Sequence, residues 1–332
     1  MDLFTRAANN DLAYLEAHLA HLEMVDGAHR SLLHHAVRGS AMDVILFLLD
    51  QDIDVNLVDA HGETALFDCA RKGKLEIAKL LIGKFARVNT VNRQGETAFH
   101  FAARKGDFEL LKLLVEAGSY TNKKTKNGLL PVHYAIMAGN EDVVEYLLRV
   151  GEQSWFQKDT SGSTLLHYAA RTQSVRMIER LLTQDLDPND LNDQYETPLF
   201  NAVRYGTKET LRCLLDQGAY IDIANRRYET PLEIARIHDR NDLVSSLLDH
   251  AAKPEYLRLA EAQALTLAVL NRDHKALRER IEKGIPMRRD ARRKTALDYA
   301  KAYGLTSCVR LLRDVEINGK TTTGCRENAN MI

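Results

Sequence analysis

The sequence predicts an all-α repeat solenoid, because it repeats itself at a nearly constant interval. One turn-ending position, usually Thr, recurs along the 332 residues in steps of 33, apart from one step of 34 and a last step of 65. Each interval also holds two short apolar stripes at helical spacing. A fixed period of this length indicates units that pack only on their neighbours. The equivalent positions are Ser31, Thr64, Thr97, Leu130, Thr164, Thr197, Thr230 and Thr295.

Residues 92–122 show how one unit is built. Gly95 stands where a turn needs positive φ, which costs glycine least. Thr97 follows as a helix N-cap, and the next position is Pro in three other units, as is typical of the first residue of a helix. The first helix ends at Gly106, and the second begins at Asp107. The packing residues of the two helices are Phe99, Ala102 and Ala103, then Phe108, Leu110, Leu111, Leu113 and Leu114.

The two ends of the array depart from this pattern, as terminal repeats with a polar outer face should. Residues 258–284 form a degenerate unit, preceded by an altered connection over 249–261, and the turn motif returns at Thr295. The total is about ten units including caps. The predicted organisation is a repeat domain over 1–313, with an N-terminal capping repeat at 1–25 and degenerate and C-terminal repeats at 258–313, then a flexible tail at 314–332.

The turn sequence is close to Gly-x-Thr-Pro-Leu-His-x-Ala in the six units anchored at positions 64, 97, 130, 164, 197 and 230. The second helices end in a Leu-Leu pair followed by Gly-Ala, as in residues 214–219. This pattern resembles the ankyrin repeat over roughly residues 1–313. The resemblance implies two antiparallel helices and a β-hairpin-like finger in each unit. A rival helical repeat with a period of 34 residues lacks the Thr-Pro-Leu-His turn.

By this resemblance, the finger tips and the exposed side of the first helix line a concave groove that binds another protein. Basic residues recur at the helix positions, and a stripe of Arg would favour an acidic peptide or protein surface through bidentate pairs. Arg or Lys before the Gly is also common in ankyrin repeats generally, so the sequence leaves a purely structural stripe open. The candidate partner-binding residues are Arg38, His61, Arg71, Lys72, Arg93, Gln94, Arg104, Lys105, Lys126, Met137, Trp155, Arg171, Asp193, Arg204, Tyr205, Arg226 and Arg227.

One junction between units is irregular. Residues 151–159 carry the single 34-residue step and the only Trp of the chain. Because Trp and Tyr dominate interface hot spots, Trp155 and Phe156 are candidate anchors for a partner. Alternatively, one ring fills the pocket that a buried Val occupies in other repeats. We expect at least one of the two rings to be buried.

The C-terminal part of the array is basic. Residues 272–294 hold ten Lys or Arg and four Asp or Glu, in a protein of formal net charge −1. Such a block suits acidic proteins, RNA or DNA. It lacks the interleaved aromatic residues on which single strands stack. Nucleic-acid binding is therefore the alternative function, and a solvated capping face is the simpler interpretation.

The sequence offers no complete constellation for catalysis, a cofactor or a metal, so we expect a non-enzymatic protein. Histidines recur at one slot of the first helix, but stacked repeats lie about 10 Å apart, whereas zinc–nitrogen bonds measure about 2 Å. By the resemblance, each of these histidines braces its turn through hydrogen bonds to its own and the adjacent repeat. Cys69 occupies a small buried slot, as expected for an inert core thiol. The recurring histidines are His34, His100, His133 and His167.

The composition is ordinary for a soluble protein, with 45% hydrophobic and 27% charged residues. No window approaches the ~20 apolar residues that span a bilayer, and the start lacks a secretory pattern. The four cysteines are few and widely spaced, which favours reduced thiols inside the cell. We expect a monomer in the cytoplasm that binds no membrane, and the sequence leaves the nucleus of a eukaryotic cell open.

Overall fold

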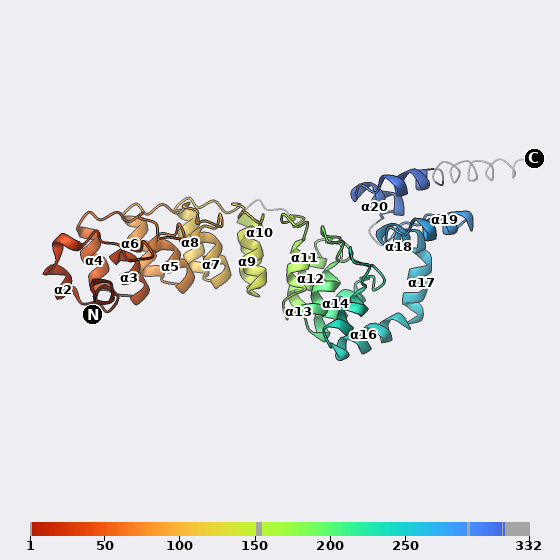
Figure 1. Ribbon diagram of the computed structural model, residues 1–332, viewed down its shortest axis with the longest axis horizontal. Coiled ribbons are helices and arrows are strands. Elements are labelled where there is room, and N and C mark those ends of the chain that lie inside the picture. Colours follow the sequence, from red (N-terminus) through yellow and green to blue (C-terminus); the bar gives the residue numbers. More distant parts are fainter. Residues whose placement is uncertain (1, 151–154, 291–292, 314, 316–332) are drawn as a thin grey trace, which may run out of the picture. The chain divides into compact units, whose positions relative to one another are not determined.

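The repeating element of the structure is a pair of short helices followed by an extended, irregular finger (Figure 1). The computed structural model describes residues 2–150, 155–290, 293–313 and 315. Among these residues the β-type pairings outside helices are isolated bridges, so the protein is an all-α repeat solenoid, as predicted. The chain divides into two compact units, Met1–Met177 and Ile178–Ile332. The predicted flexible tail lies almost wholly outside the described residues.

In the first unit, each repeat packs its first helix on the first helix of the next repeat. The series runs from α1 through α3, α5, α7 and α9 to α11. Asp2 and Asp11 cap the two short helices of the expected N-terminal capping repeat. The helices are α1 (Leu3–Ala8), α2 (Leu12–Glu16), the 3-10 turn η1 (Leu19–His21), α3 (Leu32–Gly39), α4 (Met42–Asp50), α5 (Ala65–Lys72), α6 (Leu75–Gly83), α7 (Ala98–Lys105), α8 (Phe108–Glu116), α9 (Pro131–Met137), α10 (Glu141–Val150) and α11 (Leu165–Ala169).

The second unit contains two regular repeats and then a different arrangement. Helix α12 (Val175–Leu182) crosses the boundary between the units. A further helical stretch covers 306–313. The other helices are α13 (Pro198–Tyr205), α14 (Lys208–Asp216), α15 (Pro231–Ile237), α16 (Asn241–Ala251), α17 (Pro254–Ala262), α18 (Ala264–Leu270), α19 (His274–Glu282) and α20 (Ala296–Ala302).

The first helices begin as the turn motif predicts. In α7, the backbone N–H of Thr97 donates to Nδ1 of His100 over 3.1 Å, and the Thr97 hydroxyl lies 3.0 Å from the same nitrogen. His34 makes the same contacts at Ser31, and its Nε2 donates to the carbonyl oxygen of Glu63 in the next repeat, over 3.0 Å. The histidine slot therefore braces both its own turn and, through His34, the adjacent repeat. Pro occupies the first turn of α9, α13 and α15.

Neighbouring fingers are held in register by two recurring contacts. An Asn side chain bridges consecutive repeats: Asn89 accepts from the N–H of Tyr120 over 2.7 Å and donates to the carbonyl of Gly118 over 2.9 Å. A backbone hydrogen bond also joins neighbouring tips within a unit. In these bonds Ala60 donates to Ala28 (2.8 Å), Arg93 to His61 (2.8 Å), Lys126 to Gln94 (2.9 Å), Thr160 to Asn127 (3.1 Å) and, in the second unit, Arg226 to Gln194 (2.9 Å).

The altered connection expected over 249–261 consists of the end of α16 and the whole of α17. Tyr256 on α17 accepts a hydrogen bond from the N–H of Ile221 over 3.2 Å and donates to Asp222 over 2.8 Å. All seven residues of α18 are buried, and this helix packs on α19 and α20. The same hydrophobic cluster includes Leu191, Tyr220 and Ile223 from earlier fingers. The last two repeats of the second unit therefore pack on the fingers of earlier repeats.

Candidate functional site

Two arginines of the predicted groove are paired with carboxylates of their own repeats. In the first unit, Arg71 donates two hydrogen bonds of 2.8 Å to the two carboxylate oxygens of Glu63. In the second unit, Arg204 contacts both oxygens of Glu196, at 2.7 and 2.5 Å. The Glu196 carboxylate raises the pKa of the Arg204 guanidinium, because it favours the charged form. These arginines hold a finger to its first helix, so a carboxylate already compensates their charge.

Arg38 is also committed to the scaffold. Its Nε donates over 2.9 Å to Oδ2 of Asp68, which lies in the next repeat and is buried. Arg71 contacts the other oxygen of the same carboxylate, at 3.3 Å. Asp68 therefore links two neighbouring first helices through two candidate binding residues.

A third Glu and Arg with this spacing do not pair with each other. Glu96 and Arg104 are also eight residues apart, but Glu96 accepts hydrogen bonds from the hydroxyl of Tyr134 and from Nδ2 of Asn92. Arg104 is exposed, and no described carboxylate pairs with it. Lys72, Arg104 and Lys105, at the ends of α5 and α7, are exposed cations with no carboxylate partner among the described residues.

The finger positions of the first unit face solvent. His61, Arg93, Gln94 and Lys126 are all exposed, and the backbone bonds between tips bring them into register. Met137 adds an exposed apolar side chain at the last residue of α9. Arg171 is exposed beyond the end of α11. Exposed cations at the ends of α5 and α7 and exposed finger tips thus occur in the same series of repeats.

In the second unit the candidate positions are partly engaged in aromatic contacts. The guanidinium of Arg226 lies 4.9 Å from the centre of the Tyr195 ring, and that of Arg272 lies 3.8 Å from the same ring. The side chains of Asp193, Arg227 and Tyr205 are exposed. Tyr195 therefore joins two fingers and the degenerate repeat through cation–π contacts.

The aromatic pair at the irregular junction departs from expectation. Trp155 is half-buried and Phe156 is exposed, so neither ring is fully buried. The physical reason is that both rings lie in a turn that precedes the isolated bridge between Lys158 and Thr164, outside any helix. Residues 151–154 of this junction lie outside the described residues.

Models of ankyrin repeats match residues 33–82, 66–115, 99–192 and 166–258. The chain belongs to the ankyrin repeat family. Among solved structures, the ankyrin repeat domain of human ASB11 is similar, with 26% sequence identity and a TM-score of 0.59. The similarity covers 68% of this chain and 100% of that one. A search of curated proteins finds no match.

Ankyrin repeats are generally protein–protein interaction modules, so the charges that remain available on the surface decide what this one can bind. The ankyrin motif alone does not show that carboxylates pair with several arginines of the predicted groove. The signal that could have found them is the spacing of eight residues between Glu and Arg, which recurs in three repeats. Spacing alone does not show which Arg lacks its carboxylate partner. That depends on Tyr134 in the next repeat, whose hydroxyl donates to Glu96.

The basic block of residues 272–294 is also partly committed within this ankyrin array. Arg272 donates to the carbonyls of Ala224 and Asn225, at 3.2 and 3.0 Å, and Arg280 donates to that of Ala264 at 2.9 Å. Arg292 lies outside the described residues. The block therefore presents fewer available cations than its sequence suggests, and nucleic-acid binding through it stays a prediction.

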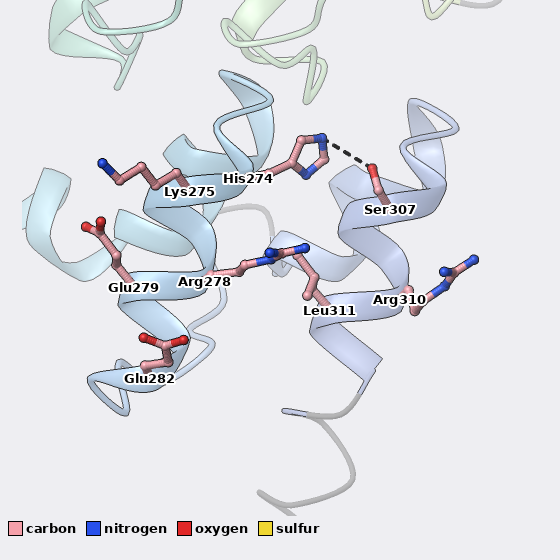
Figure 2. Close-up of a pocket in the computed structure, with 8 residues that line it drawn as sticks. All are labelled: His274, Lys275, Arg278, Glu279, Glu282, Ser307, Arg310 and Leu311. Atoms are coloured by element: carbon pink, nitrogen blue, oxygen red, sulfur yellow. Dashed lines mark hydrogen bonds between the residues drawn. The ribbon is translucent and has the colours of Figure 1, made fainter.

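A groove of about 560 Å³ lies between α19 and the helix over 306–313 (Figure 2). His274 Nε2 lies 3.3 Å from the hydroxyl of Ser307, and Arg278 reaches toward Leu311 across the groove. Lys275 and Arg310 add positive charge at its rim, whereas Glu279 and Glu282 line it with negative charge. The mixed charges of this lining favour no single class of ligand.

Burial shifts the pKa of several titratable groups towards the uncharged form. Burial lowers the pKa of His100 and His133 to about 4, because the charged form loses its hydration. Burial likewise raises the pKa of the Cys69 thiol to about 12. Across the described ranges, no three His, Cys, Asp or Glu side chains gather as a metal site would need. No described helix has both the length and the apolar character to cross a bilayer.

Proposed function

We propose that this ankyrin array holds a partner protein against the finger tips and first-helix ends of its first unit. The observation that carries this proposal is the set of exposed cations on α5 and α7 that no described carboxylate compensates. Lys72, Arg104 and Lys105 are all exposed, as are the finger tips Arg93 and Lys126. Such a surface favours an acidic segment of a partner, since each contact is a charge-assisted hydrogen bond.

The rigidity of the surface supports the same function. Backbone hydrogen bonds fix the spacing of the tips, and capping contacts fix the first helices. A preorganised surface loses little conformational entropy on binding, so a partner gains affinity from contacts of modest strength. The role proposed for the protein is therefore that of a non-enzymatic adaptor in the cytoplasm, acting as a monomer until the partner binds.

The test is affinity capture from the native cell with mass spectrometry, followed by calorimetry on the purified partner. The informative variant is Lys72→Glu/Arg104→Glu/Lys105→Glu, which leaves the structural pair of Arg71 and Glu63 intact. We expect the variant to keep its helical circular dichroism and to lose the partner. An unchanged dissociation constant would rule out this face as the binding surface.

A further inference from the structure

The two units contain the same finger site twice, 100 residues apart, and only one copy is covered. Tyr220 donates its N–H to Asn189 over 2.7 Å, and Asn189 donates to the carbonyl of Gly218 over 3.0 Å. Tyr120 stands in the identical arrangement with Asn89, with bonds of 2.7 and 2.9 Å. Yet the Tyr220 side chain is 3% exposed, whereas that of Tyr120 is 60% exposed.

A second pair of equivalent positions shows the same contrast. Leu191 is 4% exposed, whereas Val91 is 43% exposed. Leu191 and Tyr220 belong to the hydrophobic cluster formed with α18 and α20, so the last two repeats are what covers them. The corresponding apolar residues of the first unit have no such cover within the described part of the chain.

The covered copy shows what kind of element fits this site. The occupant is a pair of helices, α18 and α20, which places aliphatic side chains on Leu191 and Tyr220. Polar contacts border the apolar centre: Tyr299 donates to Asp187 over 2.8 Å, and Lys294 Nζ lies 3.7 Å from the same carboxylate. The α18–α20 pair therefore covers the apolar centre of the site. At the rim, Tyr299 supplies a hydrogen-bond donor and Lys294 a positive charge to the carboxylate of Asp187.

The uncovered copy has the opposite charge at its rim. Arg87 stands in the slot of Asp187 and reverses its charge, and Lys123 stands in the slot of Ile223, which is buried in the covered copy. The side chains of Arg87 and Lys123 are both exposed. A helix pair like α18–α20, which brings Lys294 to this edge, would meet Arg87 as a like charge. This disfavours the C-terminal repeats of a second copy as the occupant and favours an acidic one.

Phe85 supplies an independent reason to regard this edge as functional. Its φ is 63°, in a slot where Gly118 and Gly218 have φ of 82° and 84° and where the shorter Asp52 and Asp185 have φ of 50° and 59°. A bulky residue is strained in this region, and Phe85 is 87% exposed, so packing does not offset the strain. Its carbonyl accepts from Nδ2 of Asn56 over 3.2 Å, while Arg87 donates its N–H to Oδ1 of the same side chain. The backbone groups of Phe85 and Arg87 thus hydrogen-bond to the same Asn56 side chain.

We propose that the fingers at 85–96 and 118–130 form a second docking surface, which receives an acidic amphipathic helix of another protein. The apolar face of that helix covers Phe85, Val91 and Tyr120, and its carboxylates pair with Arg87 and Lys123. The basic rim ends one repeat earlier, where Asp54 fills the slot of Arg87, so the surface spans two repeats. This proposal is independent of the cations on α5 and α7.

The test uses the full-length chain and two synthetic helical peptides of about 20 residues, long enough to form a helix on the surface. Both peptides carry the same Leu and Phe stripe, and the opposite face is Glu-rich in one and Lys-rich in the other. Fluorescence anisotropy measures binding at low and physiological salt. We expect the Glu-rich peptide to bind at least about tenfold more tightly than the Lys-rich peptide, with a preference that weakens as salt rises.

Two variants locate the site without endangering the fold. Phe85→Gly installs the residue that two of the equivalent turns use, Gly118 and Gly218, and Arg87→Asp/Lys123→Ile installs the residues of the covered copy. We expect each to weaken the Glu-rich peptide by about tenfold or more, and the second to reverse the peptide preference. Arg212→Glu, at an exposed position on α14 outside both proposed surfaces, is the matched control and should leave this affinity unchanged.

Several outcomes would overturn the proposal. These are no binding of the Glu-rich peptide, equal binding of both peptides, or a loss caused by Arg212→Glu but not by Phe85→Gly. Sedimentation of the peptide-free protein tests a second copy as the occupant. A dimer that Phe85→Gly dissociates would assign the surface to self-association and refute the acidic partner.

Discussion

The guanidinium of Arg71 is held by both oxygens of Glu63, which precedes it by eight residues, at 2.8 Å each. The same guanidinium lies 4.4 Å from the centre of the Phe101 ring in the next repeat. Arg71 therefore ties together a finger, its own first helix and the neighbouring repeat. A residue at a typical binding position of an ankyrin repeat is here part of the scaffold.

Reversing the charge of Arg71 should destabilise the first unit. Arg71→Glu places two carboxylates side by side, and we expect the free energy of unfolding to fall by about 2 kcal/mol, less than for a fully buried pair, because 34% of the Arg71 side chain is exposed. Lys72→Glu, at the adjacent exposed position, should change it by less than about 0.5 kcal/mol. Urea unfolding followed by circular dichroism measures both. Equal effects would show that the Arg71 pair contributes nothing to stability.

The repeat architecture could be predicted because each position serves a local physical need. The structure confirms that Thr97 caps α7, that Asp107 caps α8 and that Pro131 is the first residue of α9. The state of each surface charge could not be predicted in this way. Arg71 and Arg104 look alike in sequence, and only the hydroxyl of Tyr134, one repeat away, distinguishes them by occupying Glu96.

The buried histidines should make stability depend on pH. Burial holds the pKa of His100 at about 4, against about 6.5 in the unfolded chain, so between these values the unfolded state binds more protons. Stability is complete above about pH 6.5 and falls as pH drops toward 4, by up to about 1.4 kcal/mol per pH unit for each such histidine. His100→Gln retains a capping side chain but removes the titrating group. Its unfolding free energy should therefore fall less steeply between pH 7 and pH 5.

The matched control for this pH dependence is His61→Gln, because His61 lies at an exposed finger tip. Its unfolding free energy should keep the slope of the unmodified protein. If His100→Gln and the unmodified protein show the same slope, the burial of His100 does not contribute to acid sensitivity.

The packing of the last two repeats should depend on Tyr299. Its hydroxyl lies 2.8 Å from Asp187 and 2.6 Å from Asp290, and the ring is buried. Tyr299→Phe removes the hydroxyl that contacts both carboxylates, which should cost about 1–3 kcal/mol. Hydrogen exchange should then accelerate at the amides of 187–195. Tyr228→Phe, in an exposed finger position, should leave exchange there unchanged.

The position of the last two repeats is the part of the fold that the repeat pattern does not reveal. The pattern predicts that each unit follows the one before it, whereas Tyr303 accepts a hydrogen bond from the N–H of Leu191 over 3.0 Å, across 112 residues of sequence. The interposed helix α17 makes this possible, because Tyr256 contacts the finger at Ile221 and Asp222. Such contacts depend on tertiary geometry and leave no periodic signal.

The junction between the capping repeat and the second repeat should tolerate no side chain at Gly39. A Cβ atom there would lie 1.9 Å from the carbonyl oxygen of Ala8, which is backbone and cannot rotate away. Gly39→Ala should displace α1 from α3 and lower the unfolding free energy by about 1–3 kcal/mol. Gly83 also ends its helix but has open space, so Gly83→Ala should stabilise by about 0.5–1 kcal/mol. Thermal melts and proteolysis of the first 10 or so residues distinguish the two, and equal melting temperatures would contradict this close approach.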